Sequence, residues 1–188
     1  MSDPKPLRYR IPGSLRDLVL VDLLELTGST VATAEALAMS QPSVSRRYRG
    51  VARDLGLVRN NQMPVGRRFS DTAWMRQLRR GVNHHRLACG VLRIGGAAEC
   101  AAAVSDCAWV EWVALGREQQ QQWPLLLQLE LLDGVAFAEP PGLHGLTDEY
   151  EWLRLSPGDG EAVSVVCRRD PVIAALSRTI EHLHPHQG

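Results

Sequence analysis

Residues 40–56 read Ser40-Gln41-Pro42-Ser43-Val44-Ser45-Arg46-Arg47-Tyr48-Arg49-Gly50-Val51-Ala52-Arg53-Asp54-Leu55-Gly56. Ser40 is a good N-cap, Pro42 is tolerated in a first turn, and Gly56 can end a helix, so the stretch predicts one helix. At about 100° per residue, four side chains share a narrow apolar stripe: Val44, Tyr48, Val51 and Leu55. Pro42, Arg46, Arg49 and Arg53 fall on the opposite side. The helix therefore combines a seam for the core with an arginine ridge, Arg46, Arg49 and Arg53.

Two shorter helices are expected before this segment and a hairpin after it. Apolar residues at helical spacing predict a first helix, with Leu15, Leu18, Val19, Leu23 and Leu26 on its inner side. Residues 27–30 end it, and Val31, Ala34, Ala36 and Leu37 predict a short second helix. Turn-forming residues at 60, 61, 64 and 66 predict a β-hairpin over 58–71. In this order, the elements are typical of a winged helix-turn-helix.

The arginine helix predicts contact with double-stranded DNA. The second helix of a helix-turn-helix lies in the major groove, where Gln can pair with adenine and Arg with guanine. Its N-terminal amides also favour phosphate. The residues placed at the DNA on this ground are Gln41, Ser43, Ser45, Arg46, Arg49 and Arg53. The alternative is that the arginines form only the solvated face of an ordinary helix.

Charge is divided between the two halves of the chain. The sequence carries 21 Lys and Arg against 21 Asp and Glu, and its net charge is zero. Residues 1–88 hold 15 of the basic and 7 of the acidic residues, a formal charge of +8, and residues 89–188 carry −8. Such a division predicts two modules, of which the basic one meets a polyanion.

The second half of the chain predicts a small α/β unit. Strands are expected over 91–94, 109–115, 135–138, 152–155 and 163–167, with helices over 118–132 and 171–183. The alternation predicts a largely parallel sheet. The fold expected for the whole chain is α+β. It comprises a winged helix-turn-helix over 1–71, a linker helix over 72–88 and an α/β lobe over 89–188.

The linker helix predicts a homodimer or a higher even oligomer. Trp74, Leu78, Val82 and His85 lie at helical spacing and form an apolar stripe, while Arg76, Arg79, Arg80 and Arg86 lie off it. An isolated helix would leave the stripe exposed, so the stripe is expected to pair with a second copy. Packing against the chain's own domain is the alternative.

No signature of catalysis or of a cofactor is found in the sequence. It has no GxSxG motif, and Gly95-Gly96 lacks the spacing of a dinucleotide-binding loop. The four cysteines (Cys89, Cys100, Cys107 and Cys167) form no CxxC pair and are expected to be reduced and mostly buried. His182, His184 and His186 are expected at a solvated end rather than at a metal. The sequence shows neither an apolar stretch long enough to span a membrane nor a signal peptide, so the protein is expected in the cytoplasm. No catalytic residue, metal or cofactor is expected.

Residues 37–46 resemble a family signature. The run Leu37-Ala38-Met39-Ser40-Gln41-Pro42-Ser43-Val44-Ser45-Arg46, followed by Leu55-Gly56, is similar to the Leu-x-x-Ser-Gln-Pro-Ala-x-Ser-Arg pattern of LysR-type transcriptional regulators. The resemblance implies a dimeric DNA-binding regulator with a winged helix-turn-helix and an effector domain related to periplasmic binding proteins. It places Gln41, Pro42, Ser45 and Arg46 near the DNA and Arg67 and Arg68 in the wing.

The chain departs from this family after the signature. Residues 57–60, Leu57-Val58-Arg59-Asn60, replace the family's Leu-Phe-x-Arg, and residues 89–188 suffice for about one of two effector lobes. A cleft between two lobes cannot form from one, so no inducer pocket of the family type is expected. Candidates for contact with a protein partner are Trp109, Trp112, Trp123 and Trp152. The remaining alternative is a protein-interaction or antagonist module that heterodimerises with other regulators.

Overall fold

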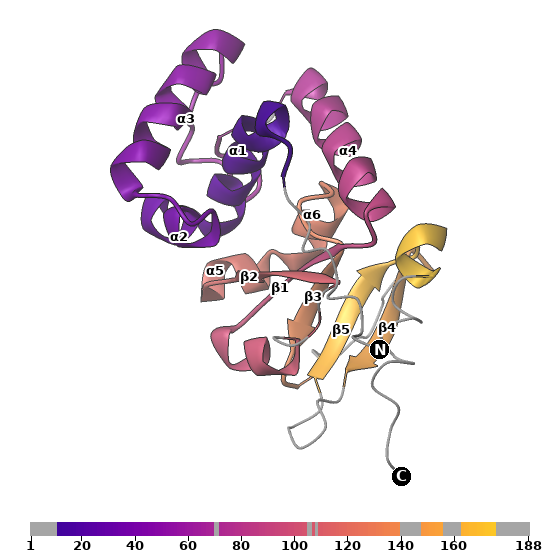
Figure 1. Cartoon of the computed structure of the whole chain (residues 1–188). Coiled ribbons are helices and arrows are strands. Elements are labelled where there is room, and N and C mark those ends of the chain that lie inside the picture. The colour runs from indigo at the N-terminus through magenta and orange to yellow at the C-terminus, as the bar shows by residue number, and fades with distance from the viewer. Residues whose placement is uncertain are drawn as a thin grey trace, which may run out of the picture.

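The computed structural model describes residues 11–69, 72–104, 107, 109–139, 148–155 and 163–175 (Figure 1). A 3-10 turn, η1 (Gly13–Leu15), leads into the helices α1 (Arg16–Thr27), α2 (Thr30–Ala36), α3 (Gln41–Leu55) and α4 (Ala73–Ala88). The strands are β1 (Leu92–Gly96), β2 (Val110–Ala114), β3 (Gly134–Phe137), β4 (Tyr150–Leu155) and β5 (Val163–Arg168). Between them lie the 3-10 turn η2 (Ala98–Ala103) and the short helices α5 (Arg117–Gln121) and α6 (Trp123–Gln128).

Local chemistry explains the start of α2 and the ends of α1 and α3. Ser29 caps α2, because its Oγ accepts hydrogen bonds from Val31 N at 3.2 Å and Ala32 N at 3.3 Å. Gly28 and Gly56 end α1 and α3 with φ of +63° and +62°, a region that favours glycine. The predicted seam of α3 is confirmed. Val44 and Val51 are buried, and Tyr48 and Leu55 pack against the same core.

The expected hairpin over 58–71 is wrong within residues 58–69, which form an irregular loop with no strand. One backbone hydrogen bond crosses the loop, from Asn60 N to Arg68 O at 2.8 Å, as a bond between two paired strands would. The next amides are engaged elsewhere. The buried Glu25 carboxylate accepts hydrogen bonds from Arg68 N at 2.8 Å and Phe69 N at 2.5 Å. Because these amides bind α1, they are not available for a strand partner.

The sheet is mixed rather than largely parallel. Its strand order is β2-β1-β3-β5-β4, with β1 parallel to β2 and β3, and β5 antiparallel to β3 and β4. A parallel connection needs a crossover of about a dozen residues or more. Only residues 156–162 separate β4 from β5, so these two strands pair as antiparallel neighbours.

The expected helix over 118–132 is divided into α5 and α6. Pro124 lies in the first turn of α6, where its missing N–H costs no helical hydrogen bond. In one continuous helix that N–H would be needed, so the division falls just before it. Of the expected helix over 171–183, residues 171–175 are helical and the rest lies outside the described residues, as do His182, His184 and His186.

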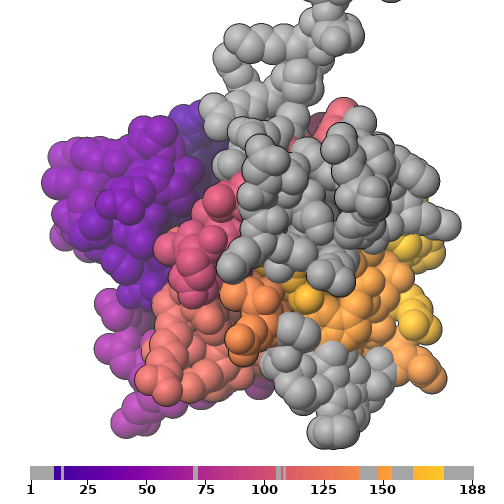
Figure 2. Space-filling view, turned by 90° about the horizontal axis from the view of Figure 1, so that it is seen from below, coloured from indigo at the N-terminus to yellow at the C-terminus, as the bar shows by residue number. Residues whose placement is uncertain are grey.

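One apolar core joins the N-terminal helices to the sheet. It contains Val19, Leu23 and Leu26 of α1, Val65 of the loop, Val82 of α4, leucines of α6 and the segment after it, and Val113, Val135 and Val166 of the sheet. Figure 2 shows the N-terminal helices, in indigo and purple, beside crimson and salmon residues of the second half of the chain. The other face of the sheet is covered by a second cluster that includes Leu87, Cys100 and Ile173. The three predicted segments therefore share buried surface.

Candidate nucleic-acid interface

A tight turn fixes α3 relative to α2. Residues 37–40 connect the two helices, and Ala38 lies in the left-handed region with φ +51°. Met39 N donates to Ala34 O at 2.9 Å and closes the end of α2. A side-chain hydrogen bond also joins the two helices, because Gln41 Nε2 of α3 donates to Thr30 Oγ1 of α2 at 3.0 Å. The non-glycine left-handed residue costs about 1–2 kcal/mol, and its surroundings must hold it there.

The arginine ridge of α3 faces solvent. Arg46, Arg49 and Arg53 are all exposed. Arg46 contacts Ser43 Oγ at 3.4 Å and Arg49 donates to Ser45 O at 3.3 Å, so both side chains lie along their own helix. No ion pair is recorded for Arg46 or Arg49 within the described part of the chain. Arg53 pairs with its neighbour Asp54 at 3.2 Å.

The remaining predicted DNA residues of α3 occupy its first turns. Gln41 and Pro42 are exposed, and Ser43 and Ser45 are half-buried. The Ser43 hydroxyl lies 2.8 Å from that of Ser40. Arg47 differs from the ridge, because it pairs with Asp17 of α1 at 3.0 Å. The structure therefore brings the predicted residues of α3 together on one face and holds Arg47 apart.

The two predicted wing arginines, Arg67 and Arg68, lie in the 57–69 loop, and Arg68 contacts the second half of the chain. Both are half-buried. The Arg68 guanidinium donates to Met63 O at 3.0 Å and pairs with Glu118 of α5 at 2.5 Å. Gln119 adds a contact beside it, donating to Thr27 O at 3.1 Å. Arg68 is thus already engaged by a carboxylate in this conformation.

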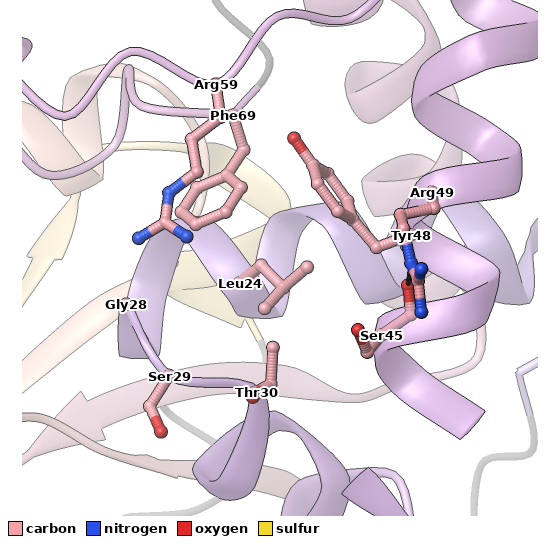
Figure 3. A pocket seen from close by; sticks show the side chains of 9 residues that line it. All are labelled: Leu24, Gly28, Ser29, Thr30, Ser45, Tyr48, Arg49, Arg59 and Phe69. Carbon is pink, nitrogen blue, oxygen red and sulfur yellow. Dashed lines mark hydrogen bonds between the residues drawn. The ribbon is translucent and has the colours of Figure 1, made fainter. Parts of the chain in front are cut away.

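A hollow of about 490 Å³ opens beside α3 (Figure 3). Arg49 of α3 and Arg59 of the 57–69 loop both line it, together with Tyr48 and Phe69. Burial raises the pKa of Tyr48, and the charge of Glu25 raises it further. The charge of Arg59 lowers this pKa but does not cancel the increase. Arg59 was not among the predicted site residues. The one sequence signal for Arg59 is its position, four residues after Leu55, the last residue of α3.

The predicted dimer stripe of α4 is only partly exposed. Trp74 and Leu78 are 41% and 42% exposed, and His85 is exposed. Val82 is 2% exposed and belongs to the core, so its expected place in an interface is wrong in this conformation. The inner side of α4 instead carries arginines. Arg79 and Arg86 are fully buried, contrary to their expected place off the packed side.

Two ion pairs hold α4 against the rest of the fold. Arg79 Nε binds Asp22 of α1 at 2.8 Å, and Arg86 binds Asp133, the residue before β3. Burial alone would raise the pKa of Asp133. The Arg86 charge and its hydrogen bond, with a bond from Arg93 N and the charge of Arg168, outweigh burial and lower the pKa. Asp133 therefore remains ionised inside the fold.

The four tryptophans named as contact candidates are all half-buried. Trp123 meets Phe137 and Tyr150 edge-on at ring-centroid distances of 6.2 and 5.6 Å, and Trp152 lies 6.5 Å from Phe137. Trp109 and Trp112 pack against the second core cluster. These side chains therefore stabilise the sheet half.

Other site types gain no support from the described ranges. No cluster there has three or more potential metal-ligating side chains, and no helix there is long and apolar enough to cross a membrane. The four cysteines all lie in the described residues, and none of them forms a disulfide bond. Cys100 and Cys167 are buried as expected, but Cys89 is exposed, because it follows the end of α4.

Comparison with known proteins gives distant structural matches. No family model matches the sequence, and no curated protein matches it. HinK, a LysR family transcriptional regulator from Pseudomonas aeruginosa, is 20% identical over 74% of this chain and 50% of its own, with a TM-score of 0.31. CrgA, a LysR-type transcriptional regulator from Neisseria meningitidis, is 18% identical over 74% and 52%, with a TM-score of 0.29. CbnR in complex with its target DNA is 16% identical over 76% and 54%, also with 0.29. The chain thus spans about half the length of these structures.

Proposed function

We propose that this protein is a sequence-specific transcription regulator that binds double-stranded DNA with a helix-turn-helix formed by α2 and α3. The observation that carries the proposal is the two-sided character of α3. Val44 and Val51 are buried, whereas Arg46 and Arg49 are exposed and have no recorded ion pair in the described residues. Exposed arginines opposite a packed seam suit a helix that lies in a groove lined by phosphates.

The proposed contacts divide into base readers and phosphate contacts. Gln41, Pro42, Ser43, Ser45 and Arg46 lie in the first turns of α3 and would meet base edges or the adjacent backbone. Arg49 and Arg53 lie further along and would meet phosphates, as would Arg67 in the loop. Arg68 would contribute only if a DNA phosphate replaced Glu118 as its partner.

Replacing Arg46 by Ala is expected to weaken binding to the preferred sequence by about 1–3 kcal/mol, because a base contact would be lost. Binding to a scrambled duplex should fall much less. The measurement is fluorescence anisotropy with a duplex selected from a random library by the wild-type protein. Arg169→Ala, which removes an exposed arginine beside β5, is the matched control. Unchanged affinity of Arg46→Ala for the selected duplex would remove Arg46 from the readers, and absence of any selected sequence would remove the proposed function.

We further propose that two copies associate through the exposed part of the α4 stripe, Trp74, Leu78 and His85. Two exposed apolar side chains one turn apart are suited to a second copy of the same helix. Light scattering at micromolar concentration is expected to give the mass of a dimer, and Leu78→Glu should shift it to the monomer. Gln77→Glu, on an exposed position outside the stripe, should leave the dimer intact. A monomeric wild type would contradict the proposal.

The described residues form one five-stranded sheet, which supports a third element of the proposal, regulation without a two-lobed inducer cleft. In this view the sheet half, which carries the negative charge of the chain, acts as a scaffold for the DNA-binding half. A partner protein or the abundance of the protein itself would then set its occupancy on DNA.

A further inference from the structure

The hollow beside α3 is positively charged without an opposing carboxylate in its wall. Arg49 and Arg59 line it together with the hydroxyl-bearing Ser29, Thr30 and Ser45 (Figure 3). None of the nine residues that line it is acidic. No carboxylate in the wall neutralises the two guanidinium groups, so an anion in the hollow would be attracted by both charges.

Arg59 is held in place before any ligand arrives. Its guanidinium lies 5.0 Å from the centroid of the Phe69 ring, a cation–π contact. The Phe69 ring is fixed in turn by an edge-on contact with Tyr48 of α3, with centroids 5.4 Å apart at 81°. Arg59 Nε donates to Asn61 Oδ1 at 2.7 Å, which leaves the two terminal nitrogens as donors for a ligand. A guanidinium ordered in this way loses little side-chain entropy when it binds.

The nearest buried carboxylate, Glu25, does not occupy the hollow. It is 1% exposed, and its two oxygens accept the amides of Arg68 and Phe69 from inside the fold. These hydrogen bonds fix the end of the loop under Arg59. Glu25 therefore supports the shape of the hollow, while the side open to solvent presents the two arginines.

We propose that this hollow binds one phosphate group of the DNA backbone, with the guanidinium groups of Arg59 and Arg49 as its two cationic contacts. The proposal rests on the proposed function. Planar guanidinium groups match phosphate oxygens in geometry and charge, and serine or threonine hydroxyls are common phosphate donors. A backbone phosphate is favoured over a free one because Arg49 belongs both to the hollow and to the face of α3 that would enter the groove.

Arg59→Ala tests the proposal, with Arg169→Ala as the matched control. The probes are a fluorescein-labelled duplex of about three helical turns that the wild type selects, and its scrambled version. We expect Arg59→Ala to weaken binding to both duplexes by about tenfold and to lower the slope of log affinity against log salt by about one. Arg59→Lys keeps the charge, so it should keep the slope. Arg59 is exposed, and unchanged circular dichroism melting would show that the variants fold.

A second measurement locates the phosphate. Duplexes in which one backbone phosphate at a time is a neutral methylphosphonate should include one position that weakens wild-type binding and leaves Arg59→Ala unaffected. An unchanged salt slope in Arg59→Ala, or the absence of any such position, would overturn the proposal. Arg46→Ala would still lose sequence preference in that case, so the proposed function would stand. If the wild type bound neither duplex, both would fall.

Titration with inorganic phosphate at constant ionic strength tests whether the hollow is instead a site for a small free anion. No binding to the DNA-free protein is expected at millimolar phosphate. Binding that disappears in Arg59→Ala, with an unchanged salt slope on DNA, would identify a site for a small free anion and overturn the assignment to DNA.

Discussion

Replacing Arg86 by Ala is expected to lower the free energy of unfolding by about 3–5 kcal/mol, the cost typical of breaking a buried ion pair from one side. Arg86 and Asp133 are both fully buried. Arg86 also donates to Val91 O at 2.9 Å and to Asn83 Oδ1 at 3.2 Å. Truncation would leave the Asp133 charge inside the fold with only Arg93 N and the more distant Arg168 as donors.

Urea denaturation of wild type and variant measures this effect. Arg80→Ala is the matched control, because Arg80 is exposed and its pair with Glu130 lies at the surface. Exposed pairs contribute about 0–1 kcal/mol, so the control should stay close to the wild type. A similar loss in both variants would show that the buried pair contributes no more than a surface pair.

The same pair predicts a dependence on pH. The pKa of Asp133 is lowered in the folded state, so its contribution is present above the unfolded-state pKa and is lost as pH falls through the folded-state value. Below about pH 4, the ordinary pKa of an aspartate side chain, the wild type should therefore lose stability. In Arg86→Ala this contribution is mostly absent already. The gap between wild type and variant should shrink in acid, and a constant gap would contradict the account.

Replacing Gly66 by Ala is expected to lower the free energy of unfolding by about 2–5 kcal/mol. Gly66 has φ +93°, a conformation that alone costs a residue with a side chain about 1–2 kcal/mol. A Cβ there would lie 3.1 Å from Leu129 Cδ1 and 3.3 Å from side-chain atoms of Leu126 and Leu131. Overpacking of a filled core adds about 1–3 kcal/mol.

The control for Gly66→Ala is the same substitution at a second glycine, around which there is open space. Gly81 lies within α4, and a Cβ there would meet nothing within 4 Å. Gly81→Ala should raise stability by about 0.5–1 kcal/mol, because alanine favours the helix. Thermal melts of the two variants should move in opposite directions. If Gly66→Ala melted with the wild type, the loop would not be packed against α6 in solution.

Local patterns were sufficient for the N-terminal helices. The seam of α3, its N-terminal turn at Ser40 and the stop at Gly56 depend on neighbours within the same helix, which the sequence displays directly. The strands were located for a similar reason, since short apolar runs between turn residues mark them. The hairpin was wrong because its outcome depends on Glu25, which lies 43 positions before Arg68 and withdraws the amides that a hairpin would use.

The buried arginines were beyond local inference. Periodicity assigns arginine to solvent, and it did so for Arg79 and Arg86. Their partners Asp22 and Asp133 lie 57 and 47 positions away, so only the assembled fold reveals them. Arg59 was missed for the same reason, because its significance comes from Phe69 below it and Arg49 across the hollow.

The loop that carries Val65 and Gly66 lies against leucines of the sheet half, and α1 contributes to the same core. A consequence is that the two halves are not interchangeable parts. A chimera that joined residues 11–88 to an unrelated sensor would expose Val65 and leave Asp22, Arg79 and Arg86 without the surroundings that bury them. Diversification of this protein would therefore proceed by coordinated substitutions on both sides of the contact between the two halves. Pairs such as Gly66 with Leu129, or Arg86 with Asp133, are where covariation among its relatives should be strongest.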